Sequence, residues 1–273
     1  MHIVRIIGAG RAGSSLAAAL SDVGWVVDDV LGRQSDLRQV ARGADVVVIA
    51  TPDDSVAAVA QAIAVHPGTV VVHLSGSLGL DVLAPHAARA ALHPLVPLPN
   101  ADIGRARLLS GATFAVGGHP IAREMAESLG GTVVEVADAD RAVYHAAATI
   151  AANHVVALLG QVQRVAATAG LELGDFLGLT RAALEDTAAL GPRQALTGPA
   201  ARGDWATLAR HRDALAPEER QAYSAGAALA RRLADDPLVV PRRPVPTGSS
   251  PVSPDPVPPA AVADRVAAAV ANV

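Results

Sequence analysis

Short runs rich in valine and isoleucine alternate with stretches of helical spacing along the first half of the chain. The runs cover residues 2–7, 25–31, 44–50, 69–74, 112–116 and 132–136, and the helical stretches include 11–22, 54–64 and 120–129. Because the runs are apolar throughout, both faces of each strand are expected to be buried, as in a parallel sheet covered by helices. The pattern therefore predicts a doubly wound, mostly parallel α/β domain over residues 1–138.

The pattern changes after residue 138, where strand-like runs give way to helical spacing. One long helix is predicted over 139–169, ended by Gly170, and further helices fit 172–190, 204–214 and 217–235. We expect a smaller all-α domain over 139–236 that binds substrate or forms a dimer interface. Residues 237–259 contain nine prolines, so 237–273 is predicted to be a flexible tail with a short terminal helix.

The composition excludes several kinds of chemistry. The chain has no cysteine, and its 22 cationic residues are all arginine. Disulfides, thiolate metal sites and a cysteine nucleophile are therefore excluded, and so is Schiff-base chemistry, which needs a lysine amine. The net charge of −4 and only six aromatic residues argue against nucleic acid or a membrane as a partner. With no signal peptide and no apolar run of about 20 residues, we expect a soluble, cytoplasmic protein.

A glycine-rich turn follows the first predicted strand and opens the first predicted helix. Its members are Gly8, Ala9, Gly10, Arg11, Ala12 and Gly13, a GxGxxG sequence. In such a turn Gly8 permits the tight bend, Gly10 lets a pyrophosphate approach the backbone, and Gly13 lets the helix lie close to the sheet. The amides at the helix start attract the phosphates. This context predicts a Rossmann dinucleotide-binding site.

The end of the second strand bears on the choice of dinucleotide. Asp28 lies 20 residues after Gly8, where an acidic residue would bind the ribose hydroxyls of NAD. The strand, however, is predicted to continue to Leu31, which would leave Arg33 and Ser35 facing the ribose. A cation and a hydroxyl suit a 2′-phosphate, so NADP is favoured and NAD remains the alternative.

Polar residues follow two further strands at the edge where ligands of open α/β sheets bind. Thr51 is expected to contact the cofactor, while Asp54 is expected to cap the following helix. Ser75 is predicted either to contact the nicotinamide or substrate, or to cap a helix over 78–88. His93, held by the following proline, is a candidate acid or base because an unperturbed imidazole titrates near neutral pH.

The long helix carries a second polar group. His145, Thr149 and Asn153 are spaced i, i+4 and would form one polar stripe on an apolar helix, with His154 beside it. Such a stripe needs partners or a ligand, so it is a candidate substrate site, or else a buried network between subunits. Arg202 could clamp a substrate carboxylate. No metal site is expected, because no carboxylate completes a ligand set with His145 and His154.

Over residues 3–235 the sequence resembles a bacterial, often actinobacterial, family of Rossmann-like oxidoreductases with a C-terminal domain of unknown function. The resemblance is carried by GAGRAG, ATPDDS, VVHLSGSLGLDVL, LHPL, YHAAATIAANH and LTGPAARGD. In wider relatives, His93 matches the His-Pro motif of prephenate dehydrogenases and the position of the active-site histidine of hydroxyacyl-CoA dehydrogenases. Asn153 matches an asparagine of hydroxyisobutyrate dehydrogenases and ketopantoate reductases. Thr149 stands where those families have a catalytic lysine, which puts their mechanism in doubt here.

Together these features predict NADPH-linked hydride transfer to a carbonyl or imine carbon of a small, anionic substrate held between the two domains. His93 is the predicted acid or base, and His145 and Asn153 would position the reacting heteroatom. The helical domain is expected to form a homodimer. The alternatives are a dinucleotide-binding sensor or regulatory protein with little turnover, and a ketopantoate-reductase-like activity by analogy with the superfamily.

Overall fold

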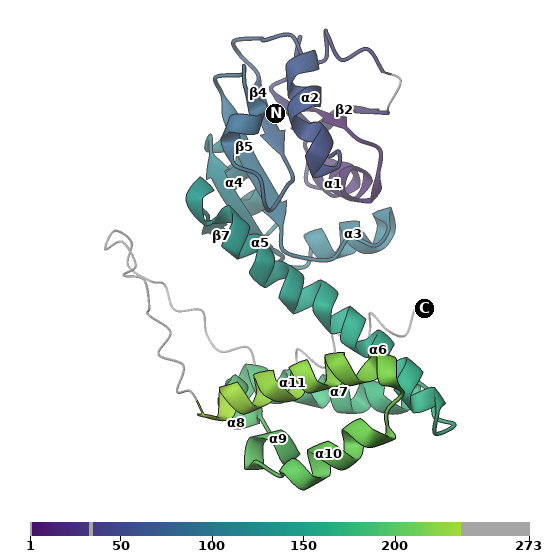
Figure 1. Cartoon of the computed structure of the whole chain (residues 1–273). Helices are drawn as coiled ribbons and strands as arrows, with labels where there is room; N and C mark the ends of the chain where they lie inside the picture. The colour runs from purple at the N-terminus through teal and green to yellow at the C-terminus, as the bar shows by residue number, and fades with distance from the viewer. Residues whose placement is uncertain (1, 33–34, 236–273) are drawn as a thin grey trace. The chain divides into compact units, whose positions relative to one another are not determined.

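The computed structural model describes residues 2–32 and 35–235, and its first part is built around one seven-stranded sheet (Figure 1). The strands are β1 (Ile3–Ile7), β2 (Val26–Leu31), β3 (Val46–Ile49), β4 (Val70–His73), β5 (Arg89–Pro94), β6 (Thr113–Gly118) and β7 (Thr132–Glu135), in the order β2-β1-β3-β4-β5-β6-β7. Neighbouring strands are parallel except for β5 and β6. The predicted doubly wound, mostly parallel α/β sheet is confirmed.

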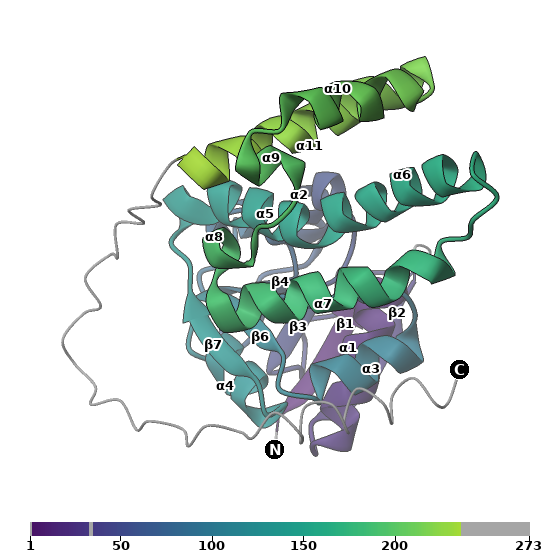
Figure 2. The same cartoon turned by 90° about the horizontal axis from the view of Figure 1, so that it is seen from below.

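Helices cover both faces of this sheet (Figures 1 and 2). One apolar core joins the sheet to α1 (Arg11–Asp22), α3 (Ala101–Leu108) and α4 (Ile121–Ser128), and the other joins it to α2 (Asp53–Ala62) and the short 3-10 helix η1 (Leu80–Leu83). Successive strand residues enter opposite cores, as Val46 and Val47 do, which explains why the strands are apolar throughout. The prediction of a helix over 78–88 is wrong, because only η1 forms there.

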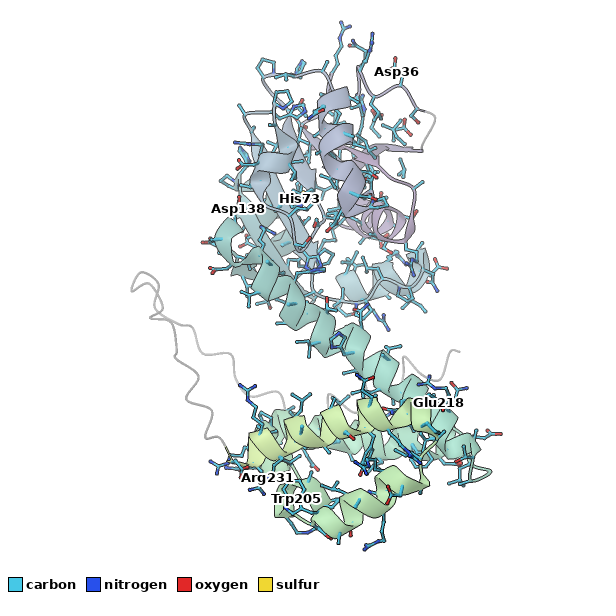
Figure 3. The ribbon with its side chains drawn as sticks, viewed as in Figure 1. Asp36, His73, Asp138, Trp205, Glu218 and Arg231 are labelled. Atoms are coloured by element: carbon cyan, nitrogen blue, oxygen red, sulfur yellow. The ribbon has the colours of Figure 1, made fainter. Side chains whose placement is uncertain are left out.

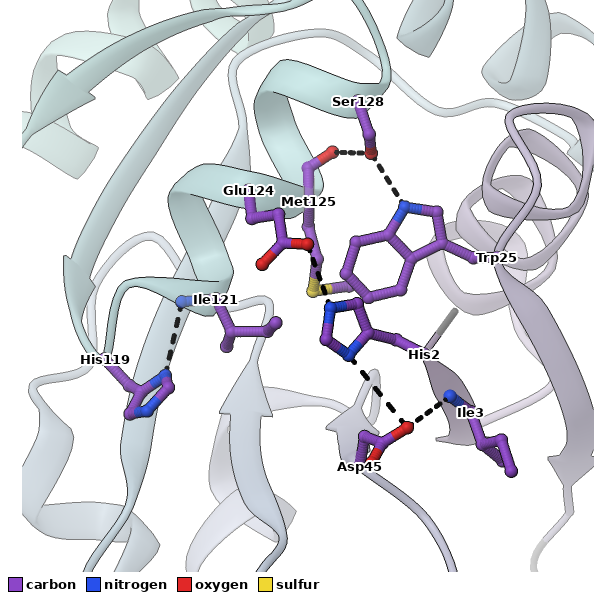
Figure 4. Close-up of polar contacts among 9 residues, drawn as sticks. All are labelled: His2, Ile3, Trp25, Asp45, His119, Ile121, Glu124, Met125 and Ser128. Atoms are coloured by element: carbon purple, nitrogen blue, oxygen red, sulfur yellow. Dashed lines mark hydrogen bonds and ion pairs between the residues drawn. The ribbon is translucent and has the colours of Figure 1, made fainter.

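A hydrogen-bonded contact joins the start of the chain to α4 (Figure 4). The His2 ring stacks on Trp25 with centroids 4.9 Å apart, and its Nε2 lies 2.9 Å from Glu124 Oε1. The indole N–H of Trp25 donates to Ser128 Oγ over 2.9 Å. Trp25 is only 8% exposed, so its indole is held firmly at this edge of the core.

The long predicted helix is present, but one wide turn interrupts it. After the 3-10 helix η2 (Asp138–Asp140) come α5 (Arg141–Thr149), a π-helical turn labelled η3 (Ile150–His154), and α6 (Val155–Ala167). Gly170 then adopts a positive φ of 73°, which ends the helix as expected. By length and composition alone, residues 138–167 would be long and apolar enough to cross a membrane, which is weak support for such a role.

Contacts divide the chain into two compact units, Met1–Gly178 and the residues from Leu179 onward. The later helices are α7 (Gly174–Leu190), α8 (Pro192–Ala195), α9 (Pro199–Arg202), α10 (Trp205–Ala214) and α11 (Pro217–Asp235). The second part is thus helical, as predicted, with α8 and α9 as short additions. The predicted domain boundary after residue 138 stays a prediction, and the predicted tail lies outside the described residues.

Candidate functional site

The glycine turn between β1 and α1 is shaped by two glycines that cannot be replaced and by one that leaves open space. Gly8 has a φ of 116°, and a Cβ there would lie 2.6 Å from the carbonyl oxygen of Ala50. A Cβ on Gly13 would lie 1.9 Å from the carbonyl oxygen of Gly8. A Cβ on Gly10 would meet no described atom within 4 Å. The turn therefore packs tightly on β3 and leaves room in front of the helix start.

The space in front of Gly10 suits a dinucleotide pyrophosphate. The first amides of α1 begin there, since Gly10 is the N-cap residue and contributes no side chain. Thr51, directly after β3, has a buried hydroxyl without a hydrogen-bond partner. The carboxyl ends of β1 and β3 lie at the reversal point of strand order, where ligands of such sheets bind. The residues present therefore fit a dinucleotide.

The end of β2 was expected to determine the choice of dinucleotide. Asp28 lies within the strand and accepts a hydrogen bond from Arg5 Nε over 2.7 Å. The strand continues to Leu31, as predicted. Ser35 follows in a partly buried loop, where its amide donates to the carbonyl oxygen of Gly32. Arg33 lies outside the described residues.

A small hydrogen-bonded cluster links the loops after β3 and β4. Asp53 Oδ2 accepts from the hydroxyls of Ser75, over 2.7 Å, and Ser77, over 2.6 Å. Ser75 Oγ in turn accepts the amides of Ser77 and Leu78. Ser75 thus braces a turn, and the alternative that it caps a helix over 78–88 is wrong. Its predicted contact with nicotinamide or substrate stays a prediction.

The capping role predicted for Asp54 is also wrong. Pro52 is the N-cap residue of α2, and no side chain caps the helix there. Asp53 and Asp54 lie inside the first turn, where a carboxylate is favoured by the helix dipole. Asp54 instead accepts from the hydroxyl of the next residue, Ser55, over 2.9 Å.

Two imidazoles and a phenol meet at the ends of β4 and β5. His93 Nδ1 lies 2.7 Å from the hydroxyl of Tyr144, and its ring meets that of His145 edge-on, with centroids 5.8 Å apart. Gly76 lies against both imidazoles: a Cβ there would be 2.9 Å from His93 Nε2 and 2.7 Å from His145 Cδ2. The absence of a side chain at Gly76 makes this approach feasible. Tyr144 was not among the predicted site residues.

Burial controls the charge of this cluster. It lowers the pKa of His93 to about 4, with His145 and Arg141 lowering it further and Asp53 opposing them. The pKa of Tyr144 is raised by burial, against the opposing effect of Arg141. His93 is therefore neutral at neutral pH. It does not titrate there, which corrects the expectation of an imidazole that exchanges its proton near pH 7.

A second polar group is formed by Arg141, Asp138 and His73, the last two of which are labelled in Figure 3. The Arg141 side chain is fully buried, and its Nε donates to Asp138 Oδ1 over 3.3 Å. Its two terminal nitrogens and both ring nitrogens of His73 are buried without a partner. A Cβ on Gly117 would lie 2.9 Å from Arg141 Nη2, so this glycine makes room for the guanidinium.

His73 shares the lowered proton affinity of His93. Burial lowers the pKa of His73 to about 4, and the charge of Arg141 adds to the effect, while Asp53 and Asp138 oppose it. Both histidines are therefore neutral over the ordinary working range of pH. The burial of Arg141 beside His73 was not predicted, because a buried arginine is uncommon.

The remaining predicted residues are distributed along the helical part. Thr149 ends α5, and Asn153 and His154 lie within the π-helical turn, where both are exposed. A π-helical turn carries the last step, from Thr149 to Asn153, so the single stripe through His145, Thr149 and Asn153 stays a prediction. Arg202 ends α9 in the second compact unit.

The sheet and the glycine turn are those of the Rossmann class. A family of Rossmann-like domains matches residues 2–99, and DUF2520, a domain of unknown function, matches residues 115–230. The two matches follow one another along the chain, a Rossmann-like domain before DUF2520, in the order that the resemblance implied. None of the curated proteins matches the sequence.

Solved structures share this fold. A protein from Bacteroides fragilis described as an NADP oxidoreductase is 18% identical, with a TM-score of 0.72 over 85% of this chain and 98% of that chain. A protein from Thermotoga maritima is 22% identical, with a TM-score of 0.65 over the same shares. Pyrroline carboxylate reductase from Plasmodium falciparum, solved with NADP bound, is 14% identical, with a TM-score of 0.57 over 85% and 98%.

Proposed function

We propose that this protein is an NADP-dependent oxidoreductase that transfers hydride to a carbonyl or imine carbon of a small, anionic substrate. The observation that carries the proposal is the placement of two features on one sheet edge. The glycine turn, with open space at Gly10, follows β1, and the imidazole pair lies at the ends of β4 and β5. These strands are parallel, so their carboxyl ends share that edge.

The residues that we assign to dinucleotide binding are those of the glycine turn and Thr51. The first amides of α1 would hold the pyrophosphate, and the hydroxyl of Thr51 would gain the partner that it lacks. A bound nicotinamide cofactor supplies the hydride. We propose NADP because Arg33 and Ser35 follow the end of β2, and because the Plasmodium reductase of the same fold binds NADP.

His93 and Tyr144 are assigned to the proton that accompanies the hydride. If the Tyr144 hydroxyl donates to His93 Nδ1, the other ring nitrogen carries the hydrogen and faces Gly76. A neutral imidazole in this tautomer can donate Nε2–H to the substrate heteroatom while its Nδ1 takes the phenolic proton. The net proton then comes from Tyr144 and is recovered from water. His145, beside Gly76, would orient the same heteroatom.

Substrate positioning is assigned to residues of the helical part. Asn153, Thr149 and His154 are proposed to contact the substrate. The carboxylate-binding role of Arg202, which lies in the second compact unit, stays a prediction. Pyrroline carboxylate reductases and a reductive aminase from Aspergillus terreus share the fold. Cyclic imines bearing a carboxylate are therefore sensible first substrates to test, together with 2-oxo and 3-oxo acids.

The experiment follows NADPH oxidation with such a panel, for the wild-type protein and for His93→Ala. We expect turnover with at least one substrate and a loss of about 10²-fold or more in the variant, as for a missing acid or base. Nucleotide affinity should stay unchanged. Tight nucleotide binding with no turnover on any panel member would favour the sensor instead.

We also propose a cytoplasmic homodimer. The helix from α5 to α6 exposes several large apolar side chains, including Val143 at 69% and Val156 at 68%. Exposed apolar surface of this kind is typical of an interface. Sedimentation over a range of concentrations tests the proposal, and a monomer at every concentration would contradict it.

A further inference from the structure

A groove between α10 and α11 is left unused by the proposed reaction. It has a volume of about 620 Å³, and its lining includes Trp205, Leu208, Tyr223 and Ala227. Trp205 is 62% exposed although it is one of only two tryptophans in the chain (Figure 3). Arg231 lies 6.0 Å from the centre of the Trp205 ring, as in a cation–π contact. The groove therefore offers rigid aromatic surface with cationic groups beside it.

The groove ends where the proline-rich part of the sequence begins. Asp235 is both the last residue of α11 and part of the groove lining. The chain continues with residues 236–273, which lie outside the described residues and include prolines at positions 251, 254, 256, 258 and 259. Proline-rich segments bind aromatic-lined grooves because their extended conformation is already formed and loses little entropy on binding.

The charge of the groove lining favours binding of one part of this tail over another. The groove lining carries three arginines (Arg212, Arg231 and Arg232) and one aspartate (Asp235), so its net charge is positive. Residues 251–259 contain Asp255 as their single charged side chain, whereas residues 241–246 contain two arginines. The first segment is attracted by the groove and the second is repelled.

The chain between α11 and the segment 251–259 is long enough for that segment to reach the groove. Fifteen residues, 236–250, separate α11 from the segment 251–259. A flexible linker of that length spans about 20 Å on average, and the stretch of α11 from Tyr223 to Asp235 is about 18 Å long. Tethering at this range gives the segment an effective concentration of about 1 mM, so that a weak intrinsic affinity suffices. We propose that the groove between α10 and α11 binds residues 251–259 of the chain's own tail.

Acrylamide quenching of tryptophan fluorescence tests the proposal. The full chain is compared with a chain ending at Asp235 and with a full-length variant in which the five prolines of 251–259 are replaced by alanine. Trp25 is nearly buried, so changes in quenching report on Trp205. We expect the quenching constant to rise about twofold in both altered chains as the indole loses its cover, and a peptide of residues 249–260 to restore protection of the shortened chain.

Three outcomes would overturn the proposal. Equal quenching in the full and shortened chains would show that the tail does not cover the groove. Full protection by the alanine variant would show that the prolines are not recognised. Protection that disappears on dilution would assign the cover to a second copy of the chain. Asp255→Asn adds a matched check, since it should weaken protection while keeping every proline.

Discussion

Replacing His73 with leucine should make the first compact unit more resistant to acid. Both ring nitrogens of His73 are buried without a partner, and its pKa is lowered to about 4. In the unfolded chain the same ring takes up a proton near its ordinary pKa of about 6.5. Between these two values the unfolded state holds more protons, so the histidine lowers stability progressively as the pH falls from 6.5 to 4.

The size of the effect follows from the two pKa values. From about pH 6.5 to pH 5 the loss in the free energy of unfolding grows by roughly 1.4 kcal/mol per pH unit, which amounts to about 2 kcal/mol per histidine. His93 has its pKa lowered to about 4 as well and contributes over the same interval. His73→Leu should therefore remove about 2 kcal/mol of the acid-induced loss of stability. At pH 7 the variant should be at least as stable, because it removes an unsatisfied buried polar group.

The assay is urea unfolding at pH 7 and pH 5, followed by Trp25 fluorescence in a Trp205→Phe background. Trp25 packs in the core of the sheet, so its signal reports on the unit that contains His73. His66→Gln is the matched control, because it replaces an exposed histidine and leaves the buried His73 in place. An equal loss of stability between pH 7 and pH 5 in His73→Leu and wild type would refute the reasoning.

Three further predictions concern the site. Gly76→Ala places a Cβ within 2.9 Å of both imidazoles, so turnover should fall at least about tenfold with NADPH affinity unchanged; normal turnover would show that the imidazole pair is not needed. Tyr144→Phe should lower kcat about 10²-fold through the lost proton relay, and an unaffected kcat would remove Tyr144 from the mechanism. The wild-type rate should be flat from pH 5 to 8 and fall toward pH 4 as His93 takes up a proton, since its pKa is about 4; a midpoint near pH 6.5 would contradict this.

Most of the sheet could be predicted because its strands are buried on both faces and therefore read as continuous apolar runs. Val46–Ile49 and Val70–His73 are fully buried along their length. The helix α3 was missed because its sequence, ADIGRARL, has little amphipathic character. Its one clear signal was Asn100, whose side chain accepts the amide of Ile103 and caps the helix.

The site was less accessible to sequence reasoning, since its contacts join residues far apart in the chain. His93 was found because a histidine before proline at a strand end is conspicuous, but its partner Tyr144 lies 51 positions away. Arg141 was missed because arginine is usually exposed, and its burial depends on the room left by Gly117. By contrast the cap of α10 depends on local spacing alone, since the carboxylate of Asp204 accepts the amide of Thr207 three residues later.

The central claim is that the start of α1 holds a dinucleotide, and calorimetric titration with NADPH tests it most directly. Gly10→Val places its Cβ in the open space in front of the helix, where no described atom lies within 4 Å, and Gly226→Val is a matched change at an equally open position in α11. We predict binding heat for the wild type and Gly226→Val, and none for a Gly10→Val protein with unchanged thermal stability. Undiminished binding by Gly10→Val, or no heat from the wild type with either NADPH or NADH, would contradict the claim.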